Sequence, residues 1–277
     1  MAGYRGVRLR IRECMFKIDD INKVIAATEK RVSKYTYPVF ALTKDKPDLF
    51  ASSVVIKFEQ KYYLITASHV ITEIISTNNS LTIGVNGKYI SISGELVCSN
   101  GSGKDNFDIA YIELNYQFIS EYEIKYLEHR RLLLSNTPVS CDIAFIHGYP
   151  NSRNKQKKAL WNTKSFKAKS YTYAGIIKND FSKWTDFGKR KENHTCMSYS
   201  KKTNKNAPLN PTGLSGGGLW IVPNISKVED FYLDSISVEY YEKESVVFST
   251  KIKQIIHFIK ETSKCKTKQS YVILPCQ

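Results

Sequence analysis

The chain has 277 residues, of which 42% are hydrophobic and 12% aromatic, which is enough apolar material for one large domain or two coupled lobes. This composition excludes a disordered chain and a small scaffold that depends on disulfides. Lysine and arginine total 41 against 26 acidic residues, so the formal net charge is +15 at pH 7 and an acidic partner would be attracted.

Targeting and redox features point to the cytoplasm. No uninterrupted apolar run approaches the roughly 20 residues that a membrane-spanning helix needs, so no membrane association is expected. Residues 5–13 carry five Arg and Glu residues, unlike the apolar segment of a secretory signal. The six cysteines lie far apart without a Cys-x-x-Cys pair, and we expect them to be reduced thiols.

Helical spacing appears near both ends of the chain. Asp19 and Asp20 precede a run of apolar residues at helical spacing, which predicts a capped helix over about 19–34 that packs against the rest of the protein. Near the C-terminus, isoleucines recur at i, i+3, i+4 and i+7 and predict a helix with one apolar stripe: Ile252, Ile255, Ile256 and Ile259. We expect this second helix to pack across a lobe.

Between these helices the sequence consists of short β-branched and aromatic runs bounded by Gly, Asn, Asp or Ser, which predicts antiparallel β-structure. The first set of runs covers 37–42, 52–58, 61–67, 80–85, 88–98 and 107–114. After a polar stretch over 115–137, the second set covers 139–147, 170–177, 217–222, 232–241 and 245–250. Two β lobes of similar length are therefore expected.

Three short segments carry candidate chemistry. His69 follows an apolar strand, where we expect it to be exposed and rigidly held at the strand end. Asp108 starts an alternating strand among apolar neighbours, and burying a carboxylate there is costly unless a partner is present. Ser215 lies among glycines just before another strand.

These residue types are the ones that nucleophilic acyl transfer needs: a hydroxyl, an imidazole that takes its proton, and a carboxylate that orients the imidazole. The glycines leave little side-chain bulk around the serine, so the N–H groups of Gly213 and Ser215 can point into one hollow that binds an oxyanion. A structural turn, a strand-end histidine and a capping aspartate are the alternative interpretations of each segment alone.

The motifs TASH, DIA and GLSGG occur in the order His, Asp, Ser, with gaps of 39 and 107 residues. Over roughly residues 37–260 this pattern resembles the trypsin/chymotrypsin-like serine proteases, and it is most similar to bacterial stand-alone trypsin-like peptidase domains. The resemblance implies a catalytic triad in which Ser215 is the nucleophile, His69 the general base and then acid, and Asp108 the orienting carboxylate. It also implies an oxyanion hole formed by Gly213 and Ser215.

The same resemblance implies an all-β, chymotrypsin-like fold with two antiparallel β-barrels, an N-terminal helix and a C-terminal helix. Residues 1–36 would form the N-terminal helical extension and 37–125 the barrel that carries His and Asp. Residues 126–250 would form the barrel that carries Ser, and 251–277 the C-terminal helix and tail. The active cleft would lie between the barrels.

Two positions depart from the pattern of the family's secreted members. Leu214 stands where digestive enzymes have an aspartate that binds a freshly cleaved N-terminus, so activation by N-terminal clipping is not expected. Val70 stands where those enzymes have a half-cystine, which agrees with a reducing compartment. We expect activity to depend on a regulatory protein partner or on ordering of the loop around Leu214.

Substrate preference stays open. The resemblance places the primary pocket near Leu209, with Val238, Glu239 and Tyr240 on its wall, and no acidic residue occupies the position of a trypsin-like pocket floor. Glu239 or Glu242 could supply a carboxylate from the wall.

Positive charge is concentrated between Arg153 and Lys205, a stretch that contains fifteen Lys or Arg residues and three acidic residues. Aromatic residues are interleaved with these cations, as in surfaces that bind nucleic acids or anionic proteins. Such a stretch is most often a solvated surface, and a recruitment surface is the alternative.

The sequence thus predicts a hydrolase: a cytoplasmic serine endopeptidase that cleaves a specific protein and requires no metal or organic cofactor. By analogy with similar bacterial domains it would be a regulated protease of a stress or phage-defence (antiviral) system. A catalytically silent trypsin-fold module that binds protein or nucleic acid through residues 153–205 is the alternative, and an esterase using the same triad is a third hypothesis.

Overall fold

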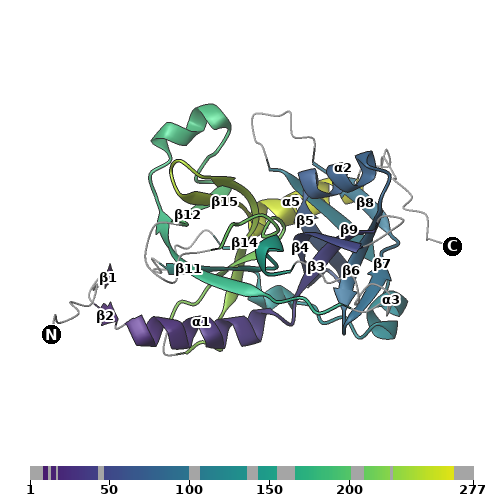
Figure 1. Ribbon diagram of the computed structural model, residues 1–277. Helices are drawn as coiled ribbons and strands as arrows, with labels where there is room; N and C mark the ends of the chain where they lie inside the picture. The colour runs from purple at the N-terminus through teal and green to yellow at the C-terminus, as the bar shows by residue number, and fades with distance from the viewer. Residues whose placement is uncertain are drawn as a thin grey trace.

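Two groups of antiparallel strands, one from each half of the chain, form two lobes that lie side by side in the computed structural model (Figure 1). The structure describes residues 9–11, 14–16, 18–42, 47–99, 107–135, 143–154, 166–200, 209–224 and 227–264. Near the N-terminus, β1 (Leu9–Ile11) and β2 (Cys14–Phe16) form a separate two-stranded sheet.

The first lobe is a seven-stranded antiparallel sheet in the order β7-β6-β3-β4-β5-β9-β8. Its strands are β3 (Thr36–Leu42), β4 (Pro47–Phe58), β5 (Lys61–Ala67), β6 (Ser80–Val85), β7 (Lys88–Ser91), β8 (Glu95–Cys98) and β9 (Ile109–Leu114). β7 and β8 occupy opposite edges of this sheet, yet only four peptide steps separate Ser91 from Glu95. Because such a segment spans at most roughly 14 Å, the sheet must curl until its two edges approach each other.

The second lobe is a closed six-stranded barrel in the order β10-β11-β12-β15-β14-β13, in which β13 also pairs with β10. Its strands are β10 (Ile143–Gly148), β11 (Tyr171–Lys178), β12 (His194–Ser198), β13 (Gly218–Ile221), β14 (Tyr232–Tyr241) and β15 (Val246–Lys251). This arrangement confirms the predicted chymotrypsin-like fold class, with helices at both ends of the chain.

Helices cover the ends and the connections of the two lobes. They are α1 (Ile18–Val32), α2 (Ser68–Ser76), α3 (Tyr116–Glu121) and α5 (Ile252–Lys264), with short 3-10 turns η1 (His129–Arg131), η2 (Asn151–Arg153) and η3 (Ser182–Phe187). The two terminal helices were predicted from their apolar spacing. No helix in the described ranges is long and apolar enough to cross a bilayer.

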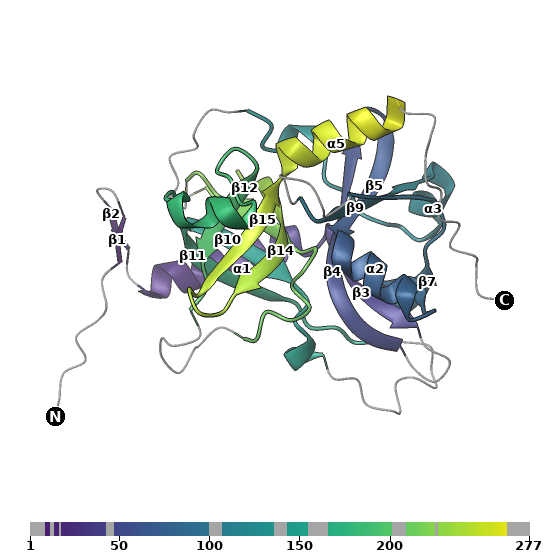
Figure 2. The same cartoon turned by 90° about the horizontal axis from the view of Figure 1, so that it is seen from above.

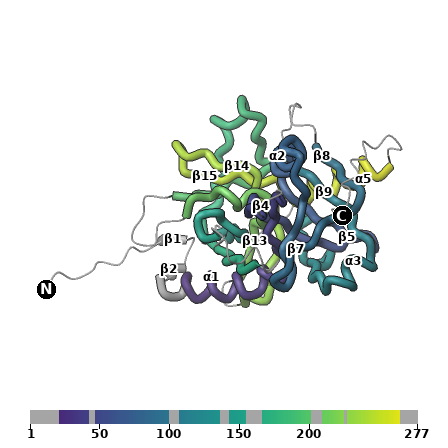
Figure 3. The backbone as a smooth tube through the Cα atoms, turned by 45° about the vertical axis from the view of Figure 1, so that its right-hand side comes forward, coloured from purple at the N-terminus to yellow at the C-terminus, as the bar shows by residue number. Residues whose placement is uncertain are grey.

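Helix α1 packs beside β10 and β11 of the second lobe, and it lies at the lower edge of the molecule in the view of Figure 3. Ser170 Oγ, just before β11, donates a hydrogen bond of 2.7 Å to Glu29 Oε1 on the helix. Thr28 and Val32 are fully buried on the same helix. The predicted packing role of this helix is therefore fulfilled by an apolar stripe with one polar contact.

Helix α5 joins the two lobes, because it begins directly after β15 and then lies over the first lobe next to β5 and β9 (Figure 2). The Phe258 ring lies 5.9 Å from the Tyr111 ring, centroid to centroid, and Tyr111 Oη is 2.7 Å from Thr262 Oγ1. Lys260 Nζ lies 2.9 Å from Glu59 Oε1 of the first lobe. The C-terminal helix thus fastens one lobe to the other.

Several local features differ from the sequence-based expectation. The run 88–98 forms two strands, because the chain turns at Gly94, where an added Cβ would lie 2.5 Å from Glu113 O. His69 is not at a strand end: β5 stops at Ala67 and His69 lies in the first turn of α2. Strand β12 and helix α3 were not expected.

The domain boundaries at 36, 125 and 250 stay a prediction, and parts of the terminal segments, 1–8 and 265–277, lie outside the described residues. Among the six cysteines, Cys98 and Cys196 are free thiols in the described part of the chain, as expected for those two. Cys141, Cys265 and Cys276 lie outside the described residues.

We expect Ile259→Ala to lower the free energy of unfolding by about 2–5 kcal/mol, because a buried isoleucine of α5 is replaced by a cavity in the main core. Denaturant titration measures this change. His257→Ala, on the exposed side of the same helix, is the matched control and should change the free energy by less than about 0.5 kcal/mol. Equal effects of the two substitutions would contradict the bridging role of α5.

Candidate active site

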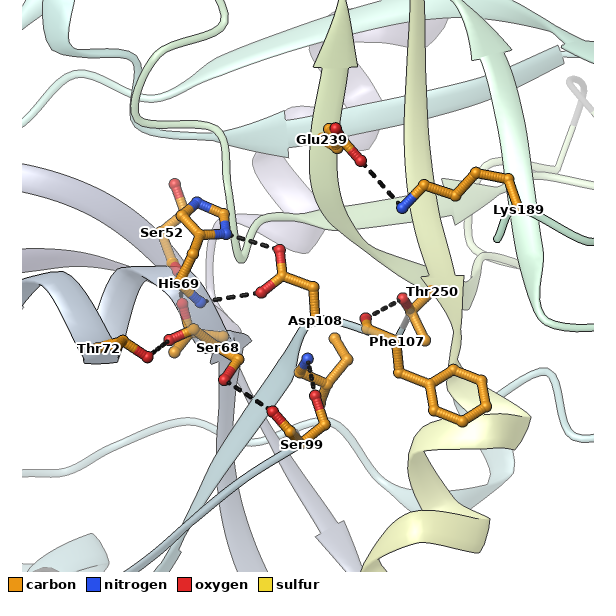
Figure 4. A network of polar contacts seen from close by, with 12 residues as sticks. Ser52, Ser68, His69, Thr72, Ser99, Phe107, Asp108, Lys189, Glu239 and Thr250 are labelled. Atoms are coloured by element: carbon orange, nitrogen blue, oxygen red, sulfur yellow. Dashed lines mark hydrogen bonds and ion pairs between the residues drawn. The ribbon is translucent and has the colours of Figure 1, made fainter. Parts of the chain in front are cut away.

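His69 and Asp108 are brought together by the pairing of β5 with β9. In that ladder Ala67 is opposite Ile109, so the residues that follow β5 lie next to the residue that precedes β9. His69 Nδ1 is 2.6 Å from Asp108 Oδ2, and the His69 backbone N–H donates to Asp108 Oδ1 at 2.9 Å (Figure 4). The aspartate is thereby bonded to both the main chain and the ring of the histidine.

This contact fixes the tautomer of the imidazole. An ionised carboxylate can only accept hydrogen bonds, so Nδ1 of His69 must carry the proton that it shares with Asp108. In the neutral ring Nε2 then has a free lone pair. The His69 side chain is 44% exposed and that of Asp108 is 20% exposed, so the imidazole can reach a reactant while the carboxylate is largely shielded.

Opposing effects act on the pKa of His69. Burial lowers this pKa, whereas the hydrogen bond to Asp108, the charge of Asp108 and the charges of Glu73 and Glu239 raise it, and the net result lies above the ordinary value of 6.5. The protonated imidazolium is therefore stabilised next to acidic groups. A base that must accept a proton during a reaction benefits from such a setting.

Asp108 itself is held in an uncommon backbone conformation, with φ of 47°. Asp is among the residues that tolerate this left-handed region. Its carbonyl oxygen accepts the Ser68 N–H at 3.0 Å, and the neighbouring Ile109 N–H donates to Ser99 Oγ at 2.9 Å. On the other side, Thr250 Oγ1 of the second lobe donates to Phe107 O (Figure 4). Contacts from both lobes thus fix the main chain around Asp108.

Ser215 lies in a tight turn just before β13, and two glycines make this turn possible. Gly213 has φ of +95° and Gly216 has φ of +81°, values that side-chain-bearing residues rarely adopt. Space is also lacking, because a Cβ at Gly213 would lie 2.6 Å from Tyr149 O and one at Gly216 would lie 2.0 Å from Ser52 O. The glycine-rich sequence is therefore required by the packing of the turn.

The peptide groups of this turn leave two particular N–H groups free. The amides of Leu214, Gly216 and Gly217 donate to Pro211 O, Ser237 O and Leu214 O at 2.7–2.8 Å. Gly213 N–H and Ser215 N–H donate to no acceptor in the described residues. These are the two amides that the sequence predicts for an oxyanion hole.

The orientation of both free amides is set by the carbonyl groups of their own peptide units. In a trans peptide the C=O and the N–H point in opposite directions. Thr212 O accepts the Asn151 N–H at 2.9 Å, and Leu214 O accepts the Gly217 N–H at 2.8 Å. Each free N–H is thus directed away from an anchored carbonyl, an arrangement that suits stabilisation of an anionic oxygen.

The serine turn packs against the strands that lead to His69. Ser215 O accepts the Ser52 N–H of β4 at 2.9 Å, and a Cβ at Gly216 would lie 2.2 Å from Thr66 Oγ1 of β5. Thr66 precedes His69 by three residues. No hydrogen bond joins Ser215 Oγ to His69 in the described residues, and catalytic hydrogen bonds are often long in a protein without substrate.

Leu214 is fully buried and packs in a small core cluster inside the second lobe, with Tyr199 and Val247 among its members. A carboxylate at this position would need an ionic partner, whereas the leucine anchors the turn by burial of apolar surface. This contact explains how the turn is held without an aspartate before the serine.

The four residues predicted to line a substrate pocket have different environments. Val238 is buried in the main core, Tyr240 packs against Tyr199 with ring centroids 5.6 Å apart, and Leu209 O accepts Tyr199 Oη at 2.8 Å. Glu239 is the acidic member of the four, and its side chain is 42% exposed. Its carboxylate charge acts on His69, as described above.

Lys189 is a neighbour that the sequence did not single out. Its side chain is fully buried, and Nζ lies 2.9 Å from Glu239 Oε2 in an ion pair (Figure 4). The contact is close, but its angles fall outside those of a hydrogen bond. This lysine belongs to the basic stretch expected to be solvated, so its burial corrects that expectation at one position.

Much of the basic stretch, 155–165 and 201–208, lies outside the described residues. Within the described part, Phe181 and Trp184 are buried, and the Arg153 guanidinium lies 4.8 Å from the centre of the Tyr171 ring. Aromatic rings buried in a core cannot stack on nucleotide bases. Phe181 and Trp184 are therefore explained by packing of the second lobe.

The other histidines take no part in the site. His147 is fully buried, its Nδ1 lies 2.8 Å from Thr172 Oγ1, and burial lowers its pKa to about 3. It is a neutral residue of the core. In the described ranges no group of three His, Cys, Asp or Glu side chains is arranged to bind a metal ion.

No protein-family model matches the chain, and no curated protein sequence matches it. Solved structures, by contrast, match the fold of this chain. A serine endoprotease from Yersinia pestis superposes with a TM-score of 0.53 and 16% identity over 86% of this chain and 65% of the other, so the chain spans less than two thirds of that protein. An inactivated protease paralogue from the scabies mite superposes with a TM-score of 0.53 and 13% identity, over 84% of this chain and 96% of the other. At these identities the likeness shows a trypsin-like fold.

The pKa of His69 is expected to be above 6.5 in the parent protein and lower in Asp108→Asn, because the amide cannot replace the charge of the carboxylate that stabilises the imidazolium. Titration of the imidazole by NMR measures both values. Asp186→Asn, an exposed acid on η3, is the control and should leave the His69 pKa unchanged. An unchanged or higher pKa in Asp108→Asn would contradict this account of the site.

Proposed function

We propose that this chain is a serine endopeptidase that hydrolyses peptide bonds of a specific protein substrate through an acyl-enzyme. The observation that carries the proposal is the pairing of two features across the lobes. His69 and Asp108 form a short hydrogen bond of 2.6 Å in one lobe, and the serine turn of the other lobe has two free N–H groups, at Gly213 and Ser215. A fold shared with proteases supports the same conclusion.

In the proposed acylation step, Ser215 Oγ attacks the carbonyl carbon of the scissile bond and its proton passes to His69 Nε2. The carbonyl oxygen becomes anionic and is bound by the N–H groups of Gly213 and Ser215, each of which contributes about 3–4 kcal/mol of transition-state stabilisation. Asp108 stabilises the imidazolium. The proton then moves from His69 to the leaving nitrogen as the peptide bond breaks.

In the proposed deacylation step, a water molecule takes the place of the leaving amine. His69 Nε2 accepts a proton from this water as its oxygen attacks the ester carbonyl of the acyl-enzyme. The same two N–H groups bind the second oxyanion. Collapse of this intermediate returns the proton to Ser215 Oγ and releases the new carboxyl group.

A free edge of β14 (Tyr232–Tyr241) favours a peptide over a small ester as the substrate. Glu239 of β14 pairs with Phe248 of β15 on one side. On the other side the ladder with β13 stops at the pair of Gly218 with Ile236, and Ser237 bonds to the serine turn, so no described strand covers the outer edge of Val238 and Glu239. An extended peptide can add to such an edge through main-chain hydrogen bonds.

We further propose that Glu239 contributes to substrate binding. Lys189 is buried, whereas the carboxylate that it holds is partly exposed, so a substrate meets the acidic member of the pair. A carboxylate has two oxygens, so Glu239 can form the ion pair with Lys189 and also accept a hydrogen bond from a second cation. Substrates with Lys or Arg near the scissile bond would be favoured, even though no acid stands at the position of a trypsin-like pocket floor.

The cellular setting is also a proposal, and sequence resemblance supports it. A role in a bacterial stress or phage-defence pathway follows by analogy with similar bacterial domains, whereas a cytoplasmic location follows from the dispersed cysteines and a regulatory protein partner from the need to restrain a protease there. Uncontrolled proteolysis in a cell would be harmful, and this chain has no aspartate at residue 214 for zymogen activation.

The second hypothesis is a silent trypsin-fold module that binds protein or nucleic acid through residues 153–205. The inactivated mite paralogue has the same fold, so the fold by itself is compatible with both functions. The contact between His69 and Asp108 favours the enzyme, because a binding module has no need of an oriented imidazole.

Ser215→Ala is expected to abolish labelling by a fluorophosphonate probe and to reduce cleavage of a proteome-derived peptide library by about 10⁵–10⁶-fold, because the attacking hydroxyl is removed. Ser263→Ala, an exposed serine on α5, is the matched control and should label and cleave as the parent does. Equal cleavage by the parent and Ser215→Ala would refute the mechanism. Turnover of small esters without any peptide cleavage would favour the esterase.

Glu239→Gln is expected to reduce the preference for peptides with Lys or Arg near the cleaved bond by about 2- to 10-fold, because a half-exposed carboxylate contributes modestly to cation binding. The same peptide library, sequenced at the cleavage sites, measures this preference. The Lys189→Met/Glu239→Gln double variant controls for the buried cation that the single change leaves unpaired. An unaltered preference in both variants would remove Glu239 from substrate recognition.

A further inference from the structure

We propose that Ser52 is a positioning residue that aligns the Ser215 turn with His69. This inference rests on the proposed function, but its main observations are contacts of a single side chain. Ser52 belongs to β4 in the first lobe, and it is fully buried against the serine turn of the second lobe.

The hydroxyl of Ser52 donates to one main-chain group of the second lobe and accepts from another. Ser52 Oγ donates to Gly213 O at 2.7 Å and accepts the Tyr149 N–H at 2.8 Å. The main chain of Ser52 adds two contacts: its N–H donates to Ser215 O at 2.9 Å, and its carbonyl accepts Thr66 Oγ1 at 2.8 Å. One residue therefore holds the carbonyl groups on both sides of Leu214.

These bonds complete the fixation of four successive peptide units. The units that carry the free N–H groups of Gly213 and Ser215 are anchored within the second lobe, as described above. The two units that alternate with them have their carbonyls at Gly213 and Ser215, and Ser52 binds both. Without the hydroxyl, Gly213 O loses its donor, and the peptide between Gly213 and Leu214 is held only through its Leu214 N–H, which donates to Pro211 O.

The position of Ser52 also relates the two lobes to each other. Thr66, bonded to Ser52 O, is on the strand that leads into His69, and Gly216 packs on the same two atoms, Ser52 O and Thr66 Oγ1. The distance between Ser215 Oγ and His69 Nε2 therefore depends on this contact. Misplacement of reacting groups by about 1 Å can lower a rate by roughly 100-fold.

Ser52→Ala tests the proposal, with Ser53→Ala as the matched control. Ser53 is the next residue, equally buried, but its hydroxyl donates to Tyr37 O at 3.2 Å within the first lobe. In Ser52→Ala we expect kcat on a cleaved peptide and the rate of fluorophosphonate labelling to fall by about 10- to 100-fold, with KM within about twofold of the parent. Ser53→Ala should retain the parent rates.

Two further readouts separate positioning from general destabilisation. The pH midpoint of kcat should be unchanged in Ser52→Ala, because the contact between His69 and Asp108 is untouched. Ser52→Cys, which keeps a weak donor of similar shape, should recover part of the lost rate. A rate loss in Ser52→Ala that matches the fraction of unfolded protein, or that Ser53→Ala shares, would overturn the proposal.

Amide hydrogen exchange tests the role of Ser52 without any catalytic readout, so it also applies if the chain has no protease activity. In Ser52→Ala the N–H groups of Leu214 and Gly216 should exchange at least about tenfold faster than in the parent, because the turn that forms their hydrogen bonds is loosened. Ser53→Ala should show the parent rates at both amides. Unchanged exchange in Ser52→Ala would refute the role of Ser52, whereas absence of labelling in every variant would refute only the protease.

Discussion

The candidate site depends on the packing of one glycine-rich turn of the second lobe against two strands of the first. Gly216 fits there because it has no side chain: any Cβ would overlap Ser52 O and Thr66 Oγ1. This close approach places the turn of Ser215 beside the strand that ends before His69. The hydroxyl of Ser52 and the peptide hydrogen bonds then leave the two N–H groups of Gly213 and Ser215 free. A single methyl group at position 216 would therefore push the serine turn away from the strand that leads to His69.

Electrostatics around His69 contrast with the charge of the whole chain. The protein carries a formal charge of +15, yet Asp108, Glu73 and Glu239 all favour the protonated imidazole, and Lys189 is buried behind Glu239. A positively charged protein therefore presents acidic groups where the proposed chemistry creates a cation. This local arrangement is a stronger argument about function than the net charge, which bears on solubility and on non-specific association.

The comparisons and the site contribute different information. The trypsin-like fold is shared with a serine endoprotease and with an inactivated paralogue, so the fold limits the possible functions without choosing between them. The choice depends on individual residues: the proton on Nδ1 of His69, the peptide orientations of the serine turn and the buried leucine before Ser215. Leu214 is informative in this respect, because it anchors the turn through apolar burial and needs no ionic partner.

The sequence by itself determined most of the strands, the two terminal helices and the three candidate residues, because these depend on local patterns: alternation, helical spacing and short motifs. Strand β5 was predicted with the bounds that the structure has, Lys61–Ala67. The local patterns did not predict β12, which has only one β-branched residue, Thr195, or α2, whose apolar residues are separated from the end of β5 by only two residues.

Only the tertiary structure revealed Ser52 and Lys189. Nothing in their neighbouring residues distinguishes them, since a serine in a strand and a lysine in a basic stretch are ordinary. Their significance arises from partners far away in the chain: Gly213 for Ser52, and Glu239 for Lys189. Such contacts are decided by how the two lobes and their strands pack in space, and local sequence patterns carry no information about that packing.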